Sequence, residues 1–382
     1  MIVDLIGFGI VMPVLPYLVK SQGASGTQLG VIAMGYAAAQ LVCAPLWGRL
    51  SDRIGRRPVL LFTIAGTALS LLALGFATSL PWIFAARVLS GAFAANISVA
   101  SAYVADVTDD SERTRWMGLL GASFGVGFVL GPAIGGLLAP YGYGVPMFAA
   151  AGLAVLNWGH ALVSLREPPQ RVLAASTERL VTGRFAELRD PVVRRLCVAN
   201  LVFSIAVTQL ETMFQYFMND RFGWDAREVA FILVGTAVVM GAVQGGGMKA
   251  LSARFSERAL VTGGSATLAV AFLALPQMPS VALLLIPLAI AAIGRGVAQP
   301  ALMSLASLAA PPARRGGVMG VFQSAASLAR VIGPLAAGLL YDRAIEAPFL
   351  LAGVLLLGVA LLGRGLPGRL ATTGSAQEPR LA

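Results

Sequence analysis

Charged residues are scarce in this sequence: Asp, Glu, Lys and Arg together make up 12% of its 382 residues, against about 25% in soluble domains. Histidine occurs once and cysteine twice, at Cys43 and Cys197 in separate apolar runs, which excludes a disulfide framework and a cysteine-based metal site. The sequence also lacks a nucleophile elbow and a Walker loop. We therefore expect no cofactor, no bound metal and no enzymatic activity.

Hydrophobic residues, in contrast, make up 57% of the chain. A single globular core stops growing at about 250–300 residues, so this apolar surface is expected to face lipid. The net charge of +10 does not indicate nucleic acid, because the basic residues lie in short loops between hydrophobic stretches.

These hydrophobic stretches have the length of membrane-spanning helices, about 20 residues each. The fold class we predict is an all-α membrane protein with twelve spans and short connections. The predicted spans are 2–19, 27–47, 59–79, 81–104, 117–139, 143–165, 196–218, 228–249, 259–276, 281–304, 317–341 and 347–363.

The basic residues predict the orientation of these spans, because Lys and Arg beside a span stay on the cytoplasmic side. Of the 28 basic residues, 21 follow the even-numbered spans and only four lie in the alternate loops, namely Lys20, Arg221, Arg227 and Arg343. Both termini are therefore predicted to be cytoplasmic. Met1 leads directly into the first span with no basic leader, which predicts that no signal peptide is removed.

The chain divides into two similar halves. The longest polar stretch, 166–195, separates six spans from six and is predicted to be a cytoplasmic linker. Met117-Gly118, Gly131-Pro132 and Gly136 recur 202 residues later as Met319-Gly320, Gly333-Pro334 and Gly338, which indicates duplication of a six-span unit. We predict six-helix bundles at 1–165 and 196–363, followed by a cytoplasmic tail at 364–382.

Two segments contain residues that suit the moving parts of a transporter. In the loop 48–58, a lone carboxylate lies among arginines that can pair with it and so hold one conformation, although the arginines could also serve only to fix topology. In the span 117–139, glycines at four-residue intervals let another helix approach closely, either as a pivot for exchange or as plain packing. The gating residues are Gly48, Asp52, Arg53, Gly55, Arg56 and Arg57, and the packing residues are Gly127, Gly131, Pro132, Gly135 and Gly136.

Both segments resemble signatures of the major facilitator superfamily: GRLSDRIGRRP at 48–58 its loop 2–3 signature, and GFVLGPAIGG at 127–136 its antiporter signature. With DLIGFGIVMP at 4–13 and RFGW at 221–224, the chain is similar to the tetracycline/H⁺ antiporters and their drug-efflux relatives. The resemblance implies two six-helix bundles around a midplane cavity and proton-coupled export. Val238–Gly241 stand where those exporters carry a histidine, so coupling would depend on carboxylates.

Ionisable residues inside spans indicate function, because a charge at mid-bilayer costs at least about 2.5–3.5 kcal/mol. Glu211 is the first candidate for proton coupling, and the alternative is a permanent ion pair with Arg295 or Arg330. Asp4 is the second candidate, although a carboxylate near a helix N-terminus is also favoured by the helix dipole. Arg87 resembles the arginine that the family uses in proton transfer.

For the substrate cavity we predict polar side chains within spans, set among apolar surface that suits an amphipathic molecule. Each amide could instead join two helices. His160 has no partner cluster and is expected to pack within its span. The predicted cavity residues are Asn96, Gln209, Gln215, Gln299, Gln323 and Arg330.

The sequence as a whole predicts a proton-coupled exporter of a hydrophobic or amphipathic small molecule, such as a drug similar to tetracycline. Its expected partners are the substrate, protons and the lipid bilayer, with a monomer in the bacterial inner membrane. The alternatives are an exporter or flippase of a lipid, sugar or metabolite, and a membrane scaffold or sensor without transport.

Overall fold

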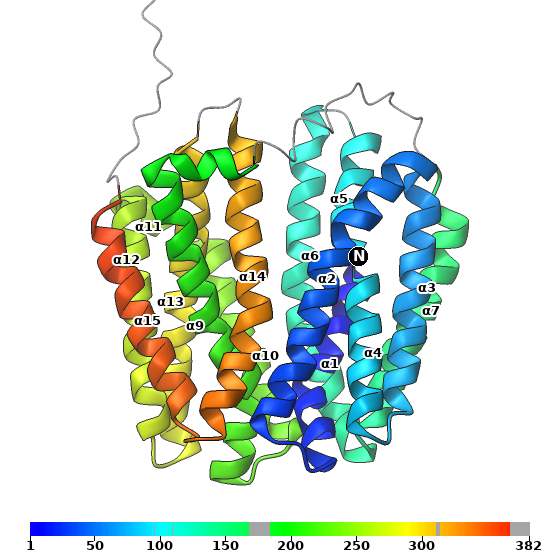
Figure 1. Cartoon of the computed structure of the whole chain (residues 1–382), viewed down its shortest axis with the longest axis horizontal. Helices are drawn as coiled ribbons and strands as arrows, with labels where there is room; N and C mark the ends of the chain where they lie inside the picture. Colours follow the sequence, from blue (N-terminus) through cyan, green and yellow to red (C-terminus); the bar gives the residue numbers. More distant parts are fainter. Residues whose placement is uncertain (95, 109, 168–183, 311–313, 367–382) are drawn as a thin grey trace, which may run out of the picture.

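The described residues of the computed structural model form only helices, gathered into two side-by-side bundles (Figure 1). The description covers the chain except residues 95, 109, 168–183, 311–313 and 367–382. The helices of the first bundle are α1 Ile2–Ser21, α2 Gly26–Ile54, α3 Arg56–Gly75, α4 Leu80–Phe93, α5 Asn96–Val107, α6 Asp110–Leu138, η1 Ala139–Tyr141 and α7 Gly144–Ser164. Those that follow are η2 Arg184–Arg189, α9 Pro191–Phe222, α10 Ala226–Ala242, the π-helical turn η3 Val243–Gly247, α11 Met248–Arg254, α12 Glu257–Ala274, η4 Leu275–Gln277, α13 Val281–Leu308, α14 Arg315–Tyr341 and α15 Ala347–Arg364.

Within this description, eleven helical segments are long and apolar enough to cross a membrane. This confirms the predicted class of all-α membrane protein. The remaining predicted span, 81–104, contains the two shorter helices α4 and α5. The three glycines Gly245, Gly246 and Gly247 lie within the π-helical turn of a continuous span from Ala226 to Arg254.

At the break between α4 and α5, side chains from α2 donate hydrogen bonds to backbone carbonyl groups at the end of α4. Where a helix ends, its last carbonyl groups lose their partners within the helix. The side-chain nitrogen of Gln40 donates to the Ala94 carbonyl oxygen at 3.2 Å, and Trp47 Nε1 donates to that of Ala92 at 2.6 Å. These contacts between α2 and α4 explain why one continuous helix over 81–104 does not form.

Several helices begin where the sequence supplies an N-cap. Ser25 forms a capping box with Gln28 at the start of α2, and Asp225 forms one with Glu228 at the start of α10. Asp190 accepts hydrogen bonds from the amides of Val192 and Val193 before α9. Since such caps satisfy amide groups that the helix leaves free, α9 begins at Pro191, ahead of the 196 expected from hydropathy.

The helix contacts repeat between the two halves. Helix α1 packs on α6 as α9 packs on α14, and α3 packs on α7 as α12 packs on α15. The equivalent partners follow the 202-residue repeat of the sequence. Of the predicted linker, 168–183 lies outside the described residues, as does 367–382 of the tail.

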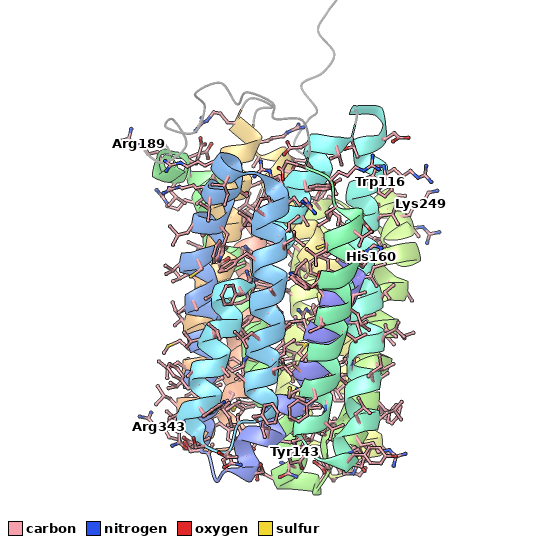
Figure 2. All side chains as sticks on the ribbon, turned by 90° about the vertical axis from the view of Figure 1, so that its right-hand side faces the viewer. Trp116, Tyr143, His160, Arg189, Lys249 and Arg343 are labelled. Carbon is pink, nitrogen blue, oxygen red and sulfur yellow. The ribbon has the colours of Figure 1, made fainter. Side chains whose placement is uncertain are left out.

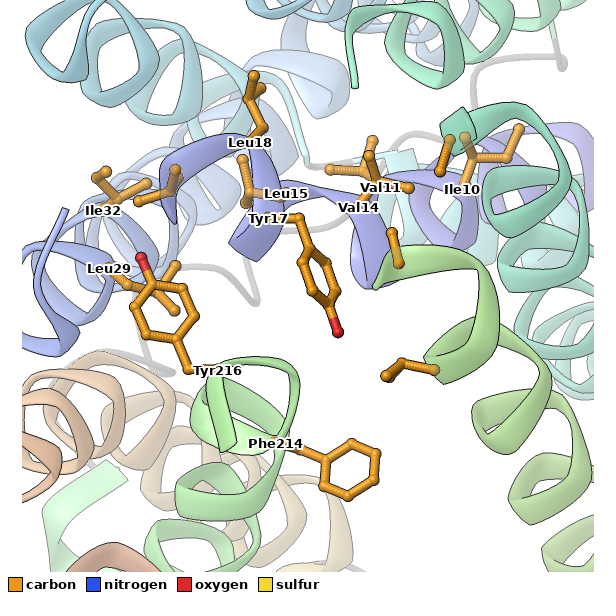
Figure 3. Packing of buried hydrophobic residues seen from close by; sticks show 14 of the residues in the cluster. Ile10, Val11, Val14, Leu15, Tyr17, Leu18, Leu29, Ile32, Phe214 and Tyr216 are labelled. Atoms are coloured by element: carbon orange, nitrogen blue, oxygen red, sulfur yellow. The ribbon is translucent and has the colours of Figure 1, made fainter. Parts of the chain in front are cut away.

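The buried apolar residues show where the two bundles join. One cluster combines α1 and α2 of the first half with α9, α10 and α14 of the second, and it includes Tyr17, Leu29 and Phe214 (Figure 3). These residues lie toward the end of the molecule opposite Glu167 and η2, which we call the closed end. Two other clusters lie toward Glu167 and η2, and each is confined to a single half.

Candidate functional site

The polar contacts between the halves also lie at the closed end. Lys20 pairs with Asp220, whose second carboxylate oxygen accepts a hydrogen bond from Tyr341. Hydrogen bonds between described residues also join the halves through tyrosine hydroxyls: Tyr17 to the Trp224 carbonyl oxygen at 3.2 Å, Tyr216 to that of Ala24 at 3.2 Å, and Tyr143 to Asp225 at 2.7 Å. The molecule is therefore sealed on this side.

Asp342 completes the seal by capping a helix of the other half. Its two carboxylate oxygens accept hydrogen bonds from the α2 amides of Gly26 at 2.7 Å and Thr27 at 2.9 Å. Burial raises the pKa of Asp342, but the hydrogen bonds from Thr27 and Gly26 outweigh it and hold the pKa below its usual value of 3.8. The cap therefore contributes fully above that usual value and is lost as pH falls through the lowered pKa.

Glycines permit the close approach of α2 and α14 at the closed end. A Cβ atom added to Gly338 would lie 2.2 Å from the Gly26 carbonyl oxygen, and one added to Gly30 would lie 2.4 Å from that of Pro334. Toward the other end, a Cβ added to Gly48 of α2 or Gly320 of α14 would meet no described atom within 4 Å. Beyond their contact at the closed end, α2 and α14 diverge toward the other end of the molecule (Figure 1).

The predicted antiporter segment packs α6 against α1. A Cβ atom added to Gly131 would lie 2.5 Å from the Gly9 Cα, and one added to Gly135 would lie 2.5 Å from the Ile10 carbonyl oxygen. Gly127 faces Leu5 in the same way, and Pro132 lies buried inside α6. Gly136 differs, because it faces Ala230 of the other half.

The predicted gating loop 48–58 is instead the end of α2 and the start of α3, joined at Gly55. Its residues form a charge network around Arg56. The Arg56 guanidinium lies 2.5 Å from the Asp52 carboxylate and 2.9 Å from that of Asp106 on α5. Glu167 accepts hydrogen bonds from the backbone amides of Arg56 at 2.6 Å and Arg57 at 2.9 Å. Sequence reasoning missed Asp106 and Glu167, whose only local signal is an acidic group just beyond a predicted span.

The turn between α2 and α3 requires glycine at position 55. Gly55 has φ +105° and ψ 157°, a region that essentially only glycine occupies, and a Cβ there would lie 2.7 Å from the Glu167 carboxylate. We expect Gly55→Ala to lower the stability by about 1–3 kcal/mol, measured as a lower midpoint of thermal unfolding in detergent. The control, Gly48→Ala, has free space for its methyl group, and an equal loss in both variants would contradict the explanation.

Glu211 of α9 forms an ion pair with Arg295 of α13. The closest oxygen and nitrogen atoms lie 2.7 Å apart, and about a third of each side chain is exposed, 32% and 31%. Gln299, one turn further along α13, accepts a hydrogen bond from Arg295 at 3.5 Å. Of the two predicted partners of Glu211, the structure thus selects Arg295 and leaves Arg330 apart.

Arg87 and Asp4 lie in the first bundle. The Arg87 side chain of α4 is 8% exposed, and its guanidinium carbon lies 4.1 Å from the centre of the Tyr36 ring. The Asp4 carboxylate accepts a hydrogen bond from Asn157 at 2.9 Å and lies 3.3 Å from the amino group of Met1. The structure does not place either residue beside Glu211.

The predicted cavity residues fall into two groups. Gln209 and Gln215 are buried within the packing of α9, and Gln209 donates to the Gly333 carbonyl oxygen at 3.4 Å. Gln299, Gln323 and Arg330 are exposed. The Asn96 side chain lies outside the described residues. His160 is exposed and contacts Ser164 at 3.1 Å (Figure 2), so the expectation that it packs inside its span is wrong.

A separate apolar groove of about 570 Å³ lies between α10 and α13, lined by residues such as Phe231, Val239 and Leu285. It does not include the Glu211–Arg295 pair. A smaller one of about 410 Å³ lies at the gating loop beside Asp52 and Arg56.

The two helical halves with equivalent contacts, joined at the closed end, agree with the family that the sequence matches. The family model described as Major Facilitator Superfamily matches residues 1–249 and 212–380. The chain belongs to this superfamily. It is a multi-pass membrane transporter and not an enzyme.

Individual proteins of the superfamily are similar over almost the whole chain. The class D tetracycline resistance protein of Salmonella ordonez is 33% identical over 350 residues, covering 90% of this chain and 88% of the relative. Multidrug resistance protein 2 of Bacillus subtilis is 28% identical over 92% of this chain and 89% of the relative. The crystal structure of the human organic anion transporter MFSD10 has 26% identity and a TM-score of 0.69, covering 95% and 96% of the two chains.

Proposed function

We propose that this superfamily member exports a hydrophobic or amphipathic small molecule from the bacterial cytoplasm in exchange for protons. The named bacterial relatives confer resistance to tetracycline or to several drugs, which supports export. The bias of basic residues supports cytoplasmic termini in the inner membrane, with the segment 166–190 inside. In this orientation the structure is open to the cytoplasm and sealed outside.

The proposed mechanism uses the bundles 1–165 and 196–363 as two bodies that rock about the contacts of α2 with α14 and of α6 with α10. The linker 166–195 and the tail 364–382 remain cytoplasmic, and one chain forms the transporter. Breaking the seal of Asp220, Asp342 and the tyrosines would open the outer side, while the Arg56 network would hold the cytoplasmic side.

The proposal of proton coupling rests on the Glu211–Arg295 ion pair. A carboxylate can hold either a proton or an arginine, and the two choices exclude each other. In the state open to the cytoplasm, Glu211 holds Arg295 at 2.7 Å, as expected after its proton has been released inside. Protonation of Glu211 from the outside would break this ion pair and free Arg295, which restores the state that precedes proton release.

The test is proton movement in proteoliposomes that contain an internal pH dye. The intact chain is expected to couple substrate movement to proton flux, and Glu211→Gln should lower that flux by about 100-fold or more because the amide carries no exchangeable proton. Glu346→Gln, an acid outside the spans and paired with Arg221, is the matched control. Retained proton-driven exchange in Glu211→Gln would exclude the coupling role, and the absence of any flux in the intact chain would favour a scaffold or sensor.

A further inference from the structure

Arg330 of α14 and Arg87 of α4 are positive charges within spans that the proposed coupling does not use. No ion pair between described residues involves either side chain. Arg330 contacts only the hydroxyl of Ser327, at 3.0 Å. Arg87 is almost fully buried, and its Nε atom has no hydrogen-bond partner. A buried charge such as that of Arg87 is costly when nothing compensates it, which points to a ligand that balances it.

Arg330 lies on the face of α14 that looks away from lipid. Gln323, Ser327 and Arg330 follow at four- and three-residue intervals and therefore share one face. The apolar side chains exposed on α14 lie on the opposite face and include Leu328, Ile332 and Leu339, which are 43%, 44% and 50% exposed. The polar face is thus turned toward the space between the halves.

The helix register places Arg330 opposite Tyr36 and Arg87. Helices α2 and α14 are antiparallel, and their contacts pair Gly26 with Gly338 and Gly30 with Pro334. One turn further, this register sets Arg330 beside residues 34–36 of α2. Arg87 stacks on the Tyr36 ring from α4, with its guanidinium carbon 4.1 Å from the ring centre.

Balancing the charges at this level of the molecule gives a positive surplus. Arg87, Arg295 and Arg330 contribute three guanidinium groups. Of the two acids within spans, Glu211 is already neutralised by Arg295, and Asp4 pairs with the amino group of Met1. A cation would meet two unpaired arginines, while a carboxylate or sulfonate would complete their hydrogen bonds, because the guanidinium fork matches these groups.

We propose that the cargo is an amphipathic organic anion whose acidic group is bound by Arg330 from one half and by Arg87 and Tyr36 from the other. This inference rests on the proposed function and specifies its substrate class. The ring system of the anion would lie against the aromatic surface of α1 and α2, where Phe8 and Tyr36 have ring centroids 6.3 Å apart. Because the anion contacts both halves, its binding would draw them together around the cargo.

The test is equilibrium binding to purified protein in detergent, which needs no transport. The probes are carboxylates and sulfonates on one to three fused aromatic rings, such as tritiated 1-naphthylacetate, and the primary amines on the same rings. We expect saturable binding of at least one anion and weaker binding of its amine. Arg330→Gln should weaken binding of the anion by about 10-fold or more, the usual effect of losing a charged hydrogen bond. Arg330→Lys should weaken it by less.

Arg343→Gln removes an exposed arginine at the closed end (Figure 2) and is the matched control, expected to bind as the intact chain does. Each variant must elute as the intact protein does in size exclusion. Binding of the amines but of no anion, no saturable binding at all, or equal anion affinity in Arg330→Gln would overturn the inference. Proton-coupled export of a cation would overturn the inference of an anionic cargo and leave the proposed function intact. Anion binding without any proton flux would support the anionic cargo and contradict the proposed proton-coupled function.

Discussion

Gly131→Ala is expected to cause a large loss of stability from the addition of one methyl group. The new Cβ atom would lie 2.5 Å from the Gly9 Cα, 2.6 Å from its carbonyl carbon and 2.8 Å from the Ile6 carbonyl oxygen. All three are backbone atoms of α1, so relief requires the two helices to move apart along their contact. Overpacking of this kind costs about 1–3 kcal/mol or more, and membrane helices depend on such close packing.

The measurement is the thermal midpoint of purified protein in one detergent, followed by size exclusion. Gly125→Ala is the matched control on the same helix, since its Cβ would meet no described atom within 4 Å. There the gain in helix propensity, about 0.5–1 kcal/mol, predicts an equal or higher midpoint. If both variants unfolded at the same temperature, the close contact of α1 and α6 would not be the source of stability.

Gly338→Ala is expected to open the closed end while leaving each bundle folded. Its Cβ would lie 2.2 Å from the Gly26 carbonyl oxygen and 2.8 Å from the Thr27 Cα, both in the other half. Separating α14 from α2 also removes Asp342 from the amides that it caps. Charged hydrogen bonds of this kind contribute about 1.5–3 kcal/mol when sheltered, and less at this exposed position. We therefore expect at least a five-fold shift toward the open arrangement.

Hydrogen exchange reports this opening directly, because the Gly26 and Thr27 amides are protected by Asp342 only while the seal is formed. The peptide that contains both should exchange at least about five-fold faster in Gly338→Ala, with the centres of the two bundles unchanged. Gly320→Ala, on the same helix with free space around its Cβ, is the control. Unchanged exchange in Gly338→Ala would show that this contact does not hold the halves together.

Most of the architecture could be predicted from local features of the sequence. Apolar runs gave the spans because a bilayer admits few other structures, and the caps at Ser25, Asp190 and Asp225 account for the helix starts. The glycine spacing of Gly127, Gly131 and Gly135 predicted a close-packed face. The break between α4 and α5 was missed, since it depends on Gln40 and Trp47 from another helix.

The candidate site was predictable only in part. Glu211 and Arg295 were both recognised as charges inside spans, but 84 residues separate them, and no local pattern chose Arg295 over Arg330. The burial of Gln209 and Gln215 likewise depends on which face of α9 its neighbours cover.

The sequence by itself determined that the chain is a helical membrane transporter built from two copies of one unit, because hydropathy, charge bias and glycine spacing act along one helix at a time. Only the tertiary structure decided which end is sealed, that Asp342 caps a helix of the other half, and that neither Arg330 nor Arg87 forms an ion pair with a described carboxylate. These features arise where helices distant in the sequence meet, and their free energies belong to pairs of surfaces that neither helix specifies alone.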